Sequence, residues 1–88
     1  MKLKSGIVFD KSGDDYIAVA TGEAGRVFNG FLRSNKTADF IMHELQDDKS
    51  EDDLVNALLE RYDVDEETAR NDVKRILSVL KDAGLLDG

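Results

Sequence analysis

The sequence contains no cysteine, no proline and no tryptophan among its 88 residues, and only one histidine. Without cysteine the chain forms no disulfide and offers no thiolate to a metal or an iron–sulfur cluster. His43 has no second histidine beside it, so a zinc site would need carboxylates almost alone. We therefore expect no metal site and no resident cofactor, with His43 an ordinary surface imidazole.

Long hydrophobic runs are also missing. No window approaches the roughly 20 apolar residues of a membrane span, and Met1–Lys4 does not resemble the start of a signal peptide. We expect no membrane association and a cytoplasmic location. The hydrophobic fraction of 41% and the charged fraction of 35% are typical of one domain that folds alone.

The patterns that would support catalysis are absent as well. The acidic clusters after residue 46 lack the alternating acids and central glycine of a calcium loop, and they fall where helices begin. The glycines form no phosphate-binding loop, and no serine has a recognisable base. We expect a protein that is not an enzyme.

The charges are unevenly distributed over a chain of net charge −7. Residues 1–35 carry five basic and four acidic residues, whereas residues 36–88 carry seven basic and fifteen acidic ones. An acidic field repels nucleic acid at long range and attracts a basic protein surface. This balance argues against a nucleic-acid partner.

The first third of the chain predicts three strands, within about residues 6–32. Residues 7–9 and 16–20 are apolar runs, and the Gly13 region between them suits a hairpin turn. Residues 21–25 predict a second turn, and residues 26–32 a third strand. This last strand would lie at a sheet edge, where its free N–H and C=O groups can pair with a partner.

Three helices follow, and each has its own start signal. We expect helices over residues 36–46, 51–62 and 66–83, where apolar residues recur at the helical period. The residues expected to cap them are Asn35, Ser50 and Asp65. Gly84 is expected to end the last helix and to return Leu85 and Leu86 to the bundle. The fold class is α+β, with a three-stranded antiparallel sheet before a three-helix bundle.

The last predicted helix carries a basic and apolar stripe. Its members recur at spacings of four, three and four: Arg70, Lys74, Leu77 and Lys81. The stripe is either a solvated helix face with ion pairs such as Glu66–Arg70, or part of a binding surface.

The chain resembles the PqqD-like family, whose members are also called precursor peptide recognition elements. The resemblance extends over residues 7–87 and depends mainly on the segment Val27–Ala38, which is similar to the family's strand leading into an Asn-capped helix. The order of residues 50–55, 62–64 and 80–86 continues the match. Many members have tryptophan in the first helix, where this chain has Met42 after Ile41.

The resemblance implies a winged helix-turn-helix-like fold and a peptide-binding function. Members bind the leader segment of a ribosomally made precursor peptide as an added strand, and present it to a modifying enzyme, often a radical SAM maturase. Any iron–sulfur cluster would belong to that enzyme. The implied contact residues are Val27, Phe28, Asn29, Phe31 and Leu32 on the strand, with Arg70, Lys74, Leu77 and Lys81 on the helix. Which alternate set of strand residues faces the groove stays open.

Two alternatives remain. A winged helix-turn-helix protein could bind DNA through Arg70, Lys74 and Arg75, although residues 66–83 carry four basic and four acidic side chains. A homodimer could instead form by pairing of two exposed strands across a two-fold axis.

Overall fold

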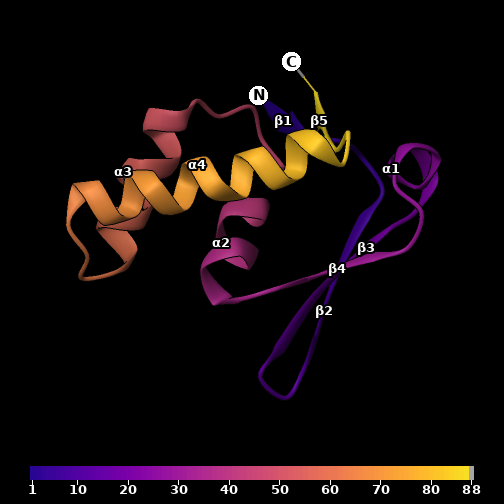
Figure 1. The fold of residues 1–88 in the computed structure, drawn as a ribbon, viewed down its shortest axis with the longest axis horizontal. Helices are drawn as coiled ribbons and strands as arrows, with labels where there is room; N and C mark the ends of the chain where they lie inside the picture. Colours follow the sequence, from indigo (N-terminus) through magenta and orange to yellow (C-terminus); the bar gives the residue numbers. More distant parts are fainter. Residues whose placement is uncertain (88) are drawn as a thin grey trace.

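A three-stranded antiparallel sheet occupies the first part of the computed structural model, which describes residues 1–87. The strands β2 (Ile7–Ser12), β3 (Asp15–Ala20) and β4 (Phe31–Ser34) are ordered β2-β3-β4, so β4 lies at an edge (Figure 1). Gly13 lies in the turn between β2 and β3, as predicted. The predicted α+β class, a sheet followed by helices, is confirmed.

The start of the third strand was predicted wrongly. A short helix, α1 (Gly22–Val27), replaces the predicted turn and the first residues of that strand. This helix forms because Ala24 is completely buried, and its amide donates to the Ser5 carbonyl at 3.1 Å. Val27 therefore ends α1, Phe28 is its C-cap, and Asn29 lies in the connection to β4.

The three longer helices begin at the predicted residues and end one or two residues earlier than predicted. They are α2 (Lys36–Glu44), α3 (Glu51–Arg61) and α4 (Glu66–Asp82). Asn35 accepts a hydrogen bond from the Ala38 amide at 2.8 Å, and Asp65 accepts one from the Thr68 amide at 2.7 Å. These caps satisfy amides that have no partner inside the helix.

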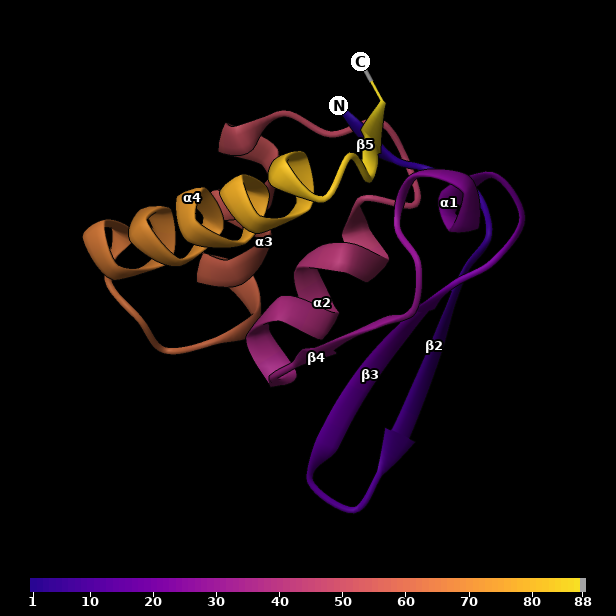
Figure 2. The same ribbon diagram turned by 45° about the vertical axis from the view of Figure 1, so that its right-hand side comes forward.

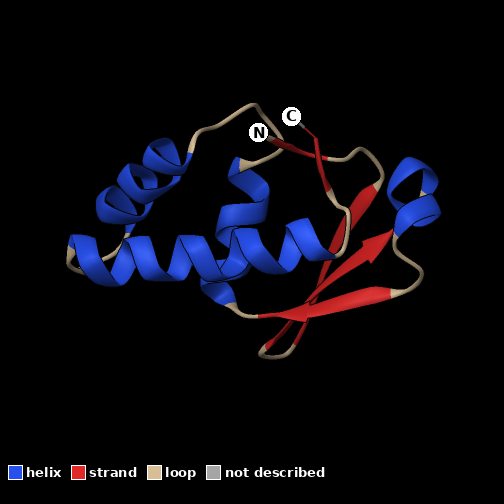
Figure 3. Cartoon of the chain, turned by 45° about the horizontal axis from the view of Figure 1, so that its top comes forward, coloured by secondary structure: helices blue, strands red, loops and turns tan. Residues whose placement is uncertain are grey.

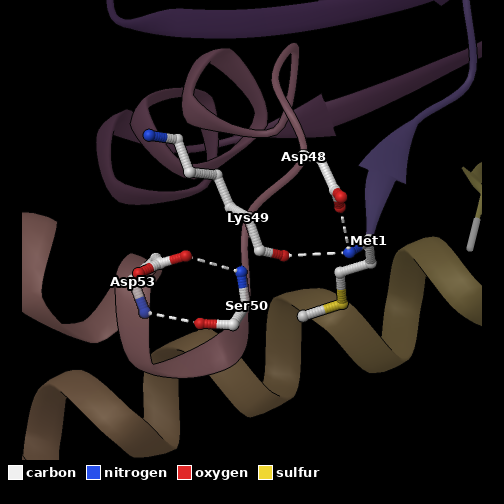
Figure 4. A network of polar contacts seen from close by, with 5 residues as sticks. All are labelled: Met1, Asp48, Lys49, Ser50 and Asp53. Carbon is white, nitrogen blue, oxygen red and sulfur yellow. Dashed lines mark hydrogen bonds and ion pairs between the residues drawn. The ribbon is translucent and has the colours of Figure 1, made fainter.

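Ser50 caps α3 through a reciprocal pair of hydrogen bonds, shown in Figure 4. The Asp53 amide donates to the Ser50 hydroxyl at 3.1 Å, and the Ser50 amide donates to the Asp53 carboxylate at 3.0 Å. In the same view the Met1 ammonium contacts Asp48 at 2.6 Å and the Lys49 carbonyl at 3.0 Å. The start of the chain is thereby attached to the connection between α2 and α3.

Helix α4 ends just before Gly84, the glycine predicted to end it. The Gly84 amide donates to the Lys81 carbonyl at 3.0 Å, and the Leu85 amide donates to the Leu80 carbonyl at 2.9 Å, which is the Schellman arrangement. Leu85 is then buried, and β5 (Leu86–Asp87) pairs antiparallel with β1 (Lys2–Leu3). Figures 1 and 2 show the two ends of the chain side by side.

The core lies between the sheet and the helices. α2 and its C-cap contribute Ile41 and Leu45, α3 contributes Leu54 and Leu58, and these side chains are almost fully buried. From α4 the buried residues are Ala69, Val73, Ile76 and Leu80. The sheet adds Ala18 from its central strand. Because α4 packs on α2 and α3, one side of this helix remains beside the sheet edge (Figure 3).

Candidate functional site

A groove of about 170 Å³ separates β4 from α4. Its lining comes from three elements: Leu32, Arg33 and Ser34 of β4, Asn35, Ala38 and Met42 at α2, and Arg75, Ile76, Val79 and Leu80 of α4. We call it the β4–α4 groove. Its floor is mainly apolar, and Arg75 is the one α4 cation at its wall. Figure 3 shows β4 and α4 running along each other at this place.

The open edge of β4 has a defined set of free backbone groups. The Ala20 amide donates to the Gly30 carbonyl at 3.1 Å, which fixes the phase of pairing between β3 and β4. Because inward and outward groups alternate along an antiparallel strand, Leu32 and Ser34 direct their backbone groups to β3. Phe31 and Arg33 therefore direct their N–H and C=O groups to the open edge.

The side chains of β4 also alternate between two faces. Leu32 is half-buried and packs against the core, so Leu32 and Ser34 belong to the inner face of the sheet. Phe31 is 55% exposed on the outer face and forms a cross-strand row with Val19 and Val8. The structure thus shows which strand residues face the groove, a point that the sequence left open.

The wall supplied by α4 contains an exposed apolar residue. Val79 is 50% exposed, although it lies one residue before the buried Leu80 and three after the buried Ile76. Arg75 is held beside it by an ion pair to Asp72, with Nη2 and Oδ1 3.0 Å apart. An extended chain placed along β4 would meet an apolar surface and two basic side chains, Arg33 and Arg75.

The residues predicted for the strand half of the site are only partly on the strand. Phe31 and Leu32 lie on β4, and Leu32 lines the groove. Val27, Phe28 and Asn29 lie before the strand, at the end of α1 and in the connection after it. Phe28 is half-buried against the core, and Val27 lies near Gly84 at the end of α4.

The residues predicted for the helix half lie on a different side of α4 from the groove. Arg70 contacts Glu51 at 2.7 Å and Asp52 at 3.0 Å at the start of α3, and these hydrogen bonds raise the pKa of Arg70. Leu77 is half-buried against the core, and Lys74 and Lys81 are exposed. None of the four lines the groove.

The sequence analysis missed Val79 as a groove residue. Val79 lies next to the buried residues of α4 but is itself exposed. The apolar surface of α4 is therefore wider than the part that packs in the core. An apolar side chain beyond the core stripe was the available signal. The basic stripe was the more conspicuous pattern, but Arg70 has its partners on α3.

A wider hollow of about 430 Å³ lies near the paired termini, lined in part by Lys4, Glu23 and Asp87. Lys4 contacts Asp87 at 2.5 Å and lies 3.9 Å from Glu23, so these three charged side chains of the hollow pair with one another. Within residues 1–87 no three His, Cys, Asp or Glu side chains are grouped as metal ligands. No described helix is both long and apolar enough to cross a membrane.

The fold and site together define a small α+β domain with an open strand edge beside a helix-lined groove. The profile of the family described as "Coenzyme PQQ synthesis protein D (PqqD)" matches residues 14–86, and the chain belongs to this family. A search of curated proteins finds no match.

Two solved structures share the fold. The first is "TbiB1 in Complex with the TbiA(beta) Leader Peptide", with a TM-score of 0.74 and 23% identity over 100% of this chain and 96% of the other. The second is "Lasso peptide synthetase B1 complexed with the leader peptide", with a TM-score of 0.68 and 24% identity over 96% and 93% of the two chains. The predicted family resemblance is confirmed.

Proposed function

We propose that the chain binds the leader segment of a ribosomally made precursor peptide and presents it to a modifying enzyme. The peptide would lie along β4 as an added strand, with alternate side chains entering the β4–α4 groove. The observation that carries this proposal is the open β4 edge beside the groove, where Phe31 and Arg33 direct their backbone groups outward.

The comparisons support the same function. The chain belongs to the PqqD family, and both similar solved structures are described as complexes with leader peptides. The proposed role is non-catalytic, with the chemistry left to the partner enzyme. That this enzyme is a radical SAM maturase, that the protein acts in the cytoplasm, and that a homodimer could occupy the same strand edge all stay predictions.

The DNA-binding alternative is not favoured. It needed Arg70, Lys74 and Arg75 as contacts, but two of these guanidinium groups already pair with carboxylates on α3 and α4. Lys74 alone would give little attraction for a polyanion in a chain of net charge −7.

The contact residues that we propose differ in part from the predicted set. Phe31 and Leu32 are retained on β4, and Arg33 joins them through its backbone. On α4 the proposed contacts are Arg75 and Val79, which line the groove.

The sharpest test of strand addition is Arg33→Pro compared with Arg33→Ala. Both substitutions remove the Arg33 side chain, but proline also removes the outward Arg33 amide while leaving the bonds between β4 and β3 in place, whereas alanine keeps that amide. A peptide carbonyl left without its donor costs about 1 to 3 kcal/mol. We expect calorimetric titration with the leader segment of a precursor peptide encoded next to the gene of this protein to show a loss of affinity of about tenfold or more for Arg33→Pro.

Arg33→Ala should bind the same leader segment within about threefold of the original chain, because the Arg33 side chain is exposed. Circular dichroism should show the same helical content for both variants. Equal affinities of Arg33→Pro and Arg33→Ala would mean that the peptide does not pair with the β4 edge.

A further inference from the structure

Four of the six aromatic residues gather on one surface away from the β4–α4 groove. The Phe9 ring stacks on His43 with centroids 4.0 Å apart, and the Phe40 ring meets Tyr62 edge-on at 5.8 Å. Tyr16 of β3 lines the same hollows. All four aromatic residues are half-buried, so one side of the group is open to solvent.

Three cations lie over these rings. Lys11 Nζ is 5.1 Å from the Tyr16 centroid, Lys36 Nζ is 5.6 Å from the Tyr62 centroid, and Arg61 Cζ is 5.8 Å from the Phe40 centroid. We call this surface the aromatic–basic face; it comprises Phe9, Tyr16, Phe40, Tyr62, His43, Lys11, Lys36 and Arg61.

These cations lack acidic partners, which is unusual in a chain with 19 acidic and 12 basic residues. Among residues 1–87, no carboxylate forms an ion pair with Lys11, Lys36 or Arg61. All three are exposed. Their positive charge is therefore available to a ligand, and the rings beneath them restrict where it can lie.

Four carboxylates lie on or beside the aromatic–basic face. Glu44 is 4.0 Å from Lys49 Nζ, and Glu60 lines a neighbouring hollow with Phe40 and Arg61. Asp39 Oδ2 is 3.5 Å from His43 Nε2, and Asp10 accepts a hydrogen bond from the Lys11 amide at 2.8 Å. They leave Lys36 and Arg61 without a counter-charge at ion-pair distance.

The surface is hollowed and continuous. A hollow of about 250 Å³ lies between the start of α2 and the end of α3, with Lys36, Arg61 and Tyr62 in its wall. A more open hollow of about 440 Å³ lies beside Lys11, and the two share Tyr16, Asp39 and His43. Figure 2 shows the β2–β3 hairpin that carries Lys11 and Tyr16 projecting past the start of α2.

The aromatic–basic face is separate from the β4–α4 groove because α2 presents two sides. Ala38 and Met42 line the groove, whereas Lys36, Phe40 and His43 lie on the other side of the same helix. No residue lines both surfaces, so a ligand on one leaves the other accessible.

From this arrangement we propose that the aromatic–basic face binds a short acidic segment of a partner protein. Carboxylates of that segment would pair with Lys36 and Arg61, while its apolar side chains would lie against Tyr62, Phe40 and Tyr16. A short segment is favoured over nucleic acid because charges beyond about 8 Å are screened at physiological salt, whereas a long polyanion would meet the rest of an acidic chain. This proposal is independent of the proposed leader-binding function.

The test is a nitrogen-15 NMR titration of the full chain with a short synthetic peptide of alternating glutamate and phenylalanine. We expect saturating shift changes at the amides of Lys36, Phe40, Arg61 and Tyr62. The double variant Lys36→Glu and Arg61→Glu should weaken binding by about tenfold or more, and the corresponding Gln variant should lie between it and the original chain.

The matched control is Lys74→Glu with Lys81→Glu, which makes the same change in net charge on exposed positions of α4. It should bind the glutamate–phenylalanine peptide within about threefold of the original chain. Any one of four outcomes overturns the proposal. They are failure to saturate at about 1 mM peptide, equal binding of a lysine–phenylalanine peptide, an equal loss in the control, and tighter binding of single-stranded oligothymidine at the same amides.

Discussion

Single residues fix where the segments of this small domain meet. Gly6 precedes β2 with a φ of 97°, and its carbonyl accepts hydrogen bonds from both the amide and the hydroxyl of Thr21. A Cβ atom at Gly6 would lie 2.0 Å from the Thr21 carbonyl oxygen. Since Thr21 is the N-cap of α1, this contact sets the position at which that helix begins.

A pair of alanine substitutions separates the backbone effect from the steric effect. Gly13 also has a positive φ, of 61°, but no atom lies within 4 Å of a Cβ placed there. We expect Gly13→Ala to cost about 1 to 2 kcal/mol through its left-handed conformation. Gly6→Ala should cost at least about 2 kcal/mol more, because the chain must move to relieve the clash.

Urea denaturation followed by circular dichroism measures both costs. Equal midpoints for the two variants would show that Gly6 serves its conformation alone. The sequence predicted the roles of Gly13 in a turn and of Gly84 at a helix end, because in both places the need for a glycine arises from the local backbone conformation. The need for glycine at position 6 arises from a contact with Thr21, and no local pattern signals it.

At the scale of elements, the sequence predicted those with local start signals. Asn35, Ser50 and Asp65 cap the three long helices as expected, because each side chain bonds an amide three residues later. Helix α1 was missed because its six residues include two glycines and only one buried side chain, Ala24. The strands β1 and β5 have two residues each and depend on pairing between distant ends of the chain.

The groove side of α4 was missed for a different physical reason. Helical periodicity shows which residues share a side, but it does not show which neighbour that side meets. The basic stripe was expected beside the sheet edge, yet Arg70 pairs with Glu51 and Asp52 of α3. The groove instead meets Arg75 and Val79. The edge position of β4 was predictable, because it followed from the order of the strands.

A comparison of two variants tests which side of α4 binds the peptide. Val79→Asp places a charge in the apolar wall of the groove, and Lys74→Asp changes an exposed position of the predicted stripe. If leader side chains enter the groove, Val79→Asp should lower leader affinity by about tenfold or more, because a carboxylate there loses water when the peptide docks.

Lys74→Asp should change leader affinity by less than about threefold, as expected for an exposed charge. Calorimetric titration with the same leader segment measures both variants, and thermal unfolding checks that both fold. The reverse order of effects would return the binding surface to the originally predicted stripe of Arg70, Lys74, Leu77 and Lys81.

At the scale of the whole molecule, the acidic charge is partly organised as caps and ties between elements. Asp48 is contacted by the Met1 ammonium, which lowers the pKa of its carboxyl group. Hydrogen bonds from Ser50 lower the pKa of Asp53, and hydrogen bonds from Thr68 lower the pKa of Asp65. At neutral pH, Asp53 and Asp65 thus cap the starts of α3 and α4, and Asp48 attaches the Met1 ammonium to the connection between α2 and α3.

The lowered pKa values predict how stability depends on pH. A carboxyl group with a lower pKa in the folded state stabilises that state above its unfolded pKa, and this contribution is lost as the pH falls through the folded pKa. The urea midpoint of the chain should therefore fall as the pH is lowered from about 5 to about 3, because the stabilising contributions of Asp48, Asp53 and Asp65 are lost on protonation. Below its isoelectric point near pH 4.5 the chain also becomes positively charged, and repulsion among its 12 lysine and arginine side chains destabilises the fold in the same direction.

A matched pair of double variants separates these two effects. Asp53→Asn with Asp65→Asn replaces two capping carboxylates by amides that do not titrate, and Asp14→Asn with Asp47→Asn makes the same change in net charge at exposed residues. We expect the cap variant to lose less stability between about pH 5 and pH 3 than the control, because its acid-sensitive contribution is already absent at pH 5. Urea midpoints at several pH values measure the difference. Parallel curves for the two variants would assign the acid response to overall charge and would contradict a role for the caps.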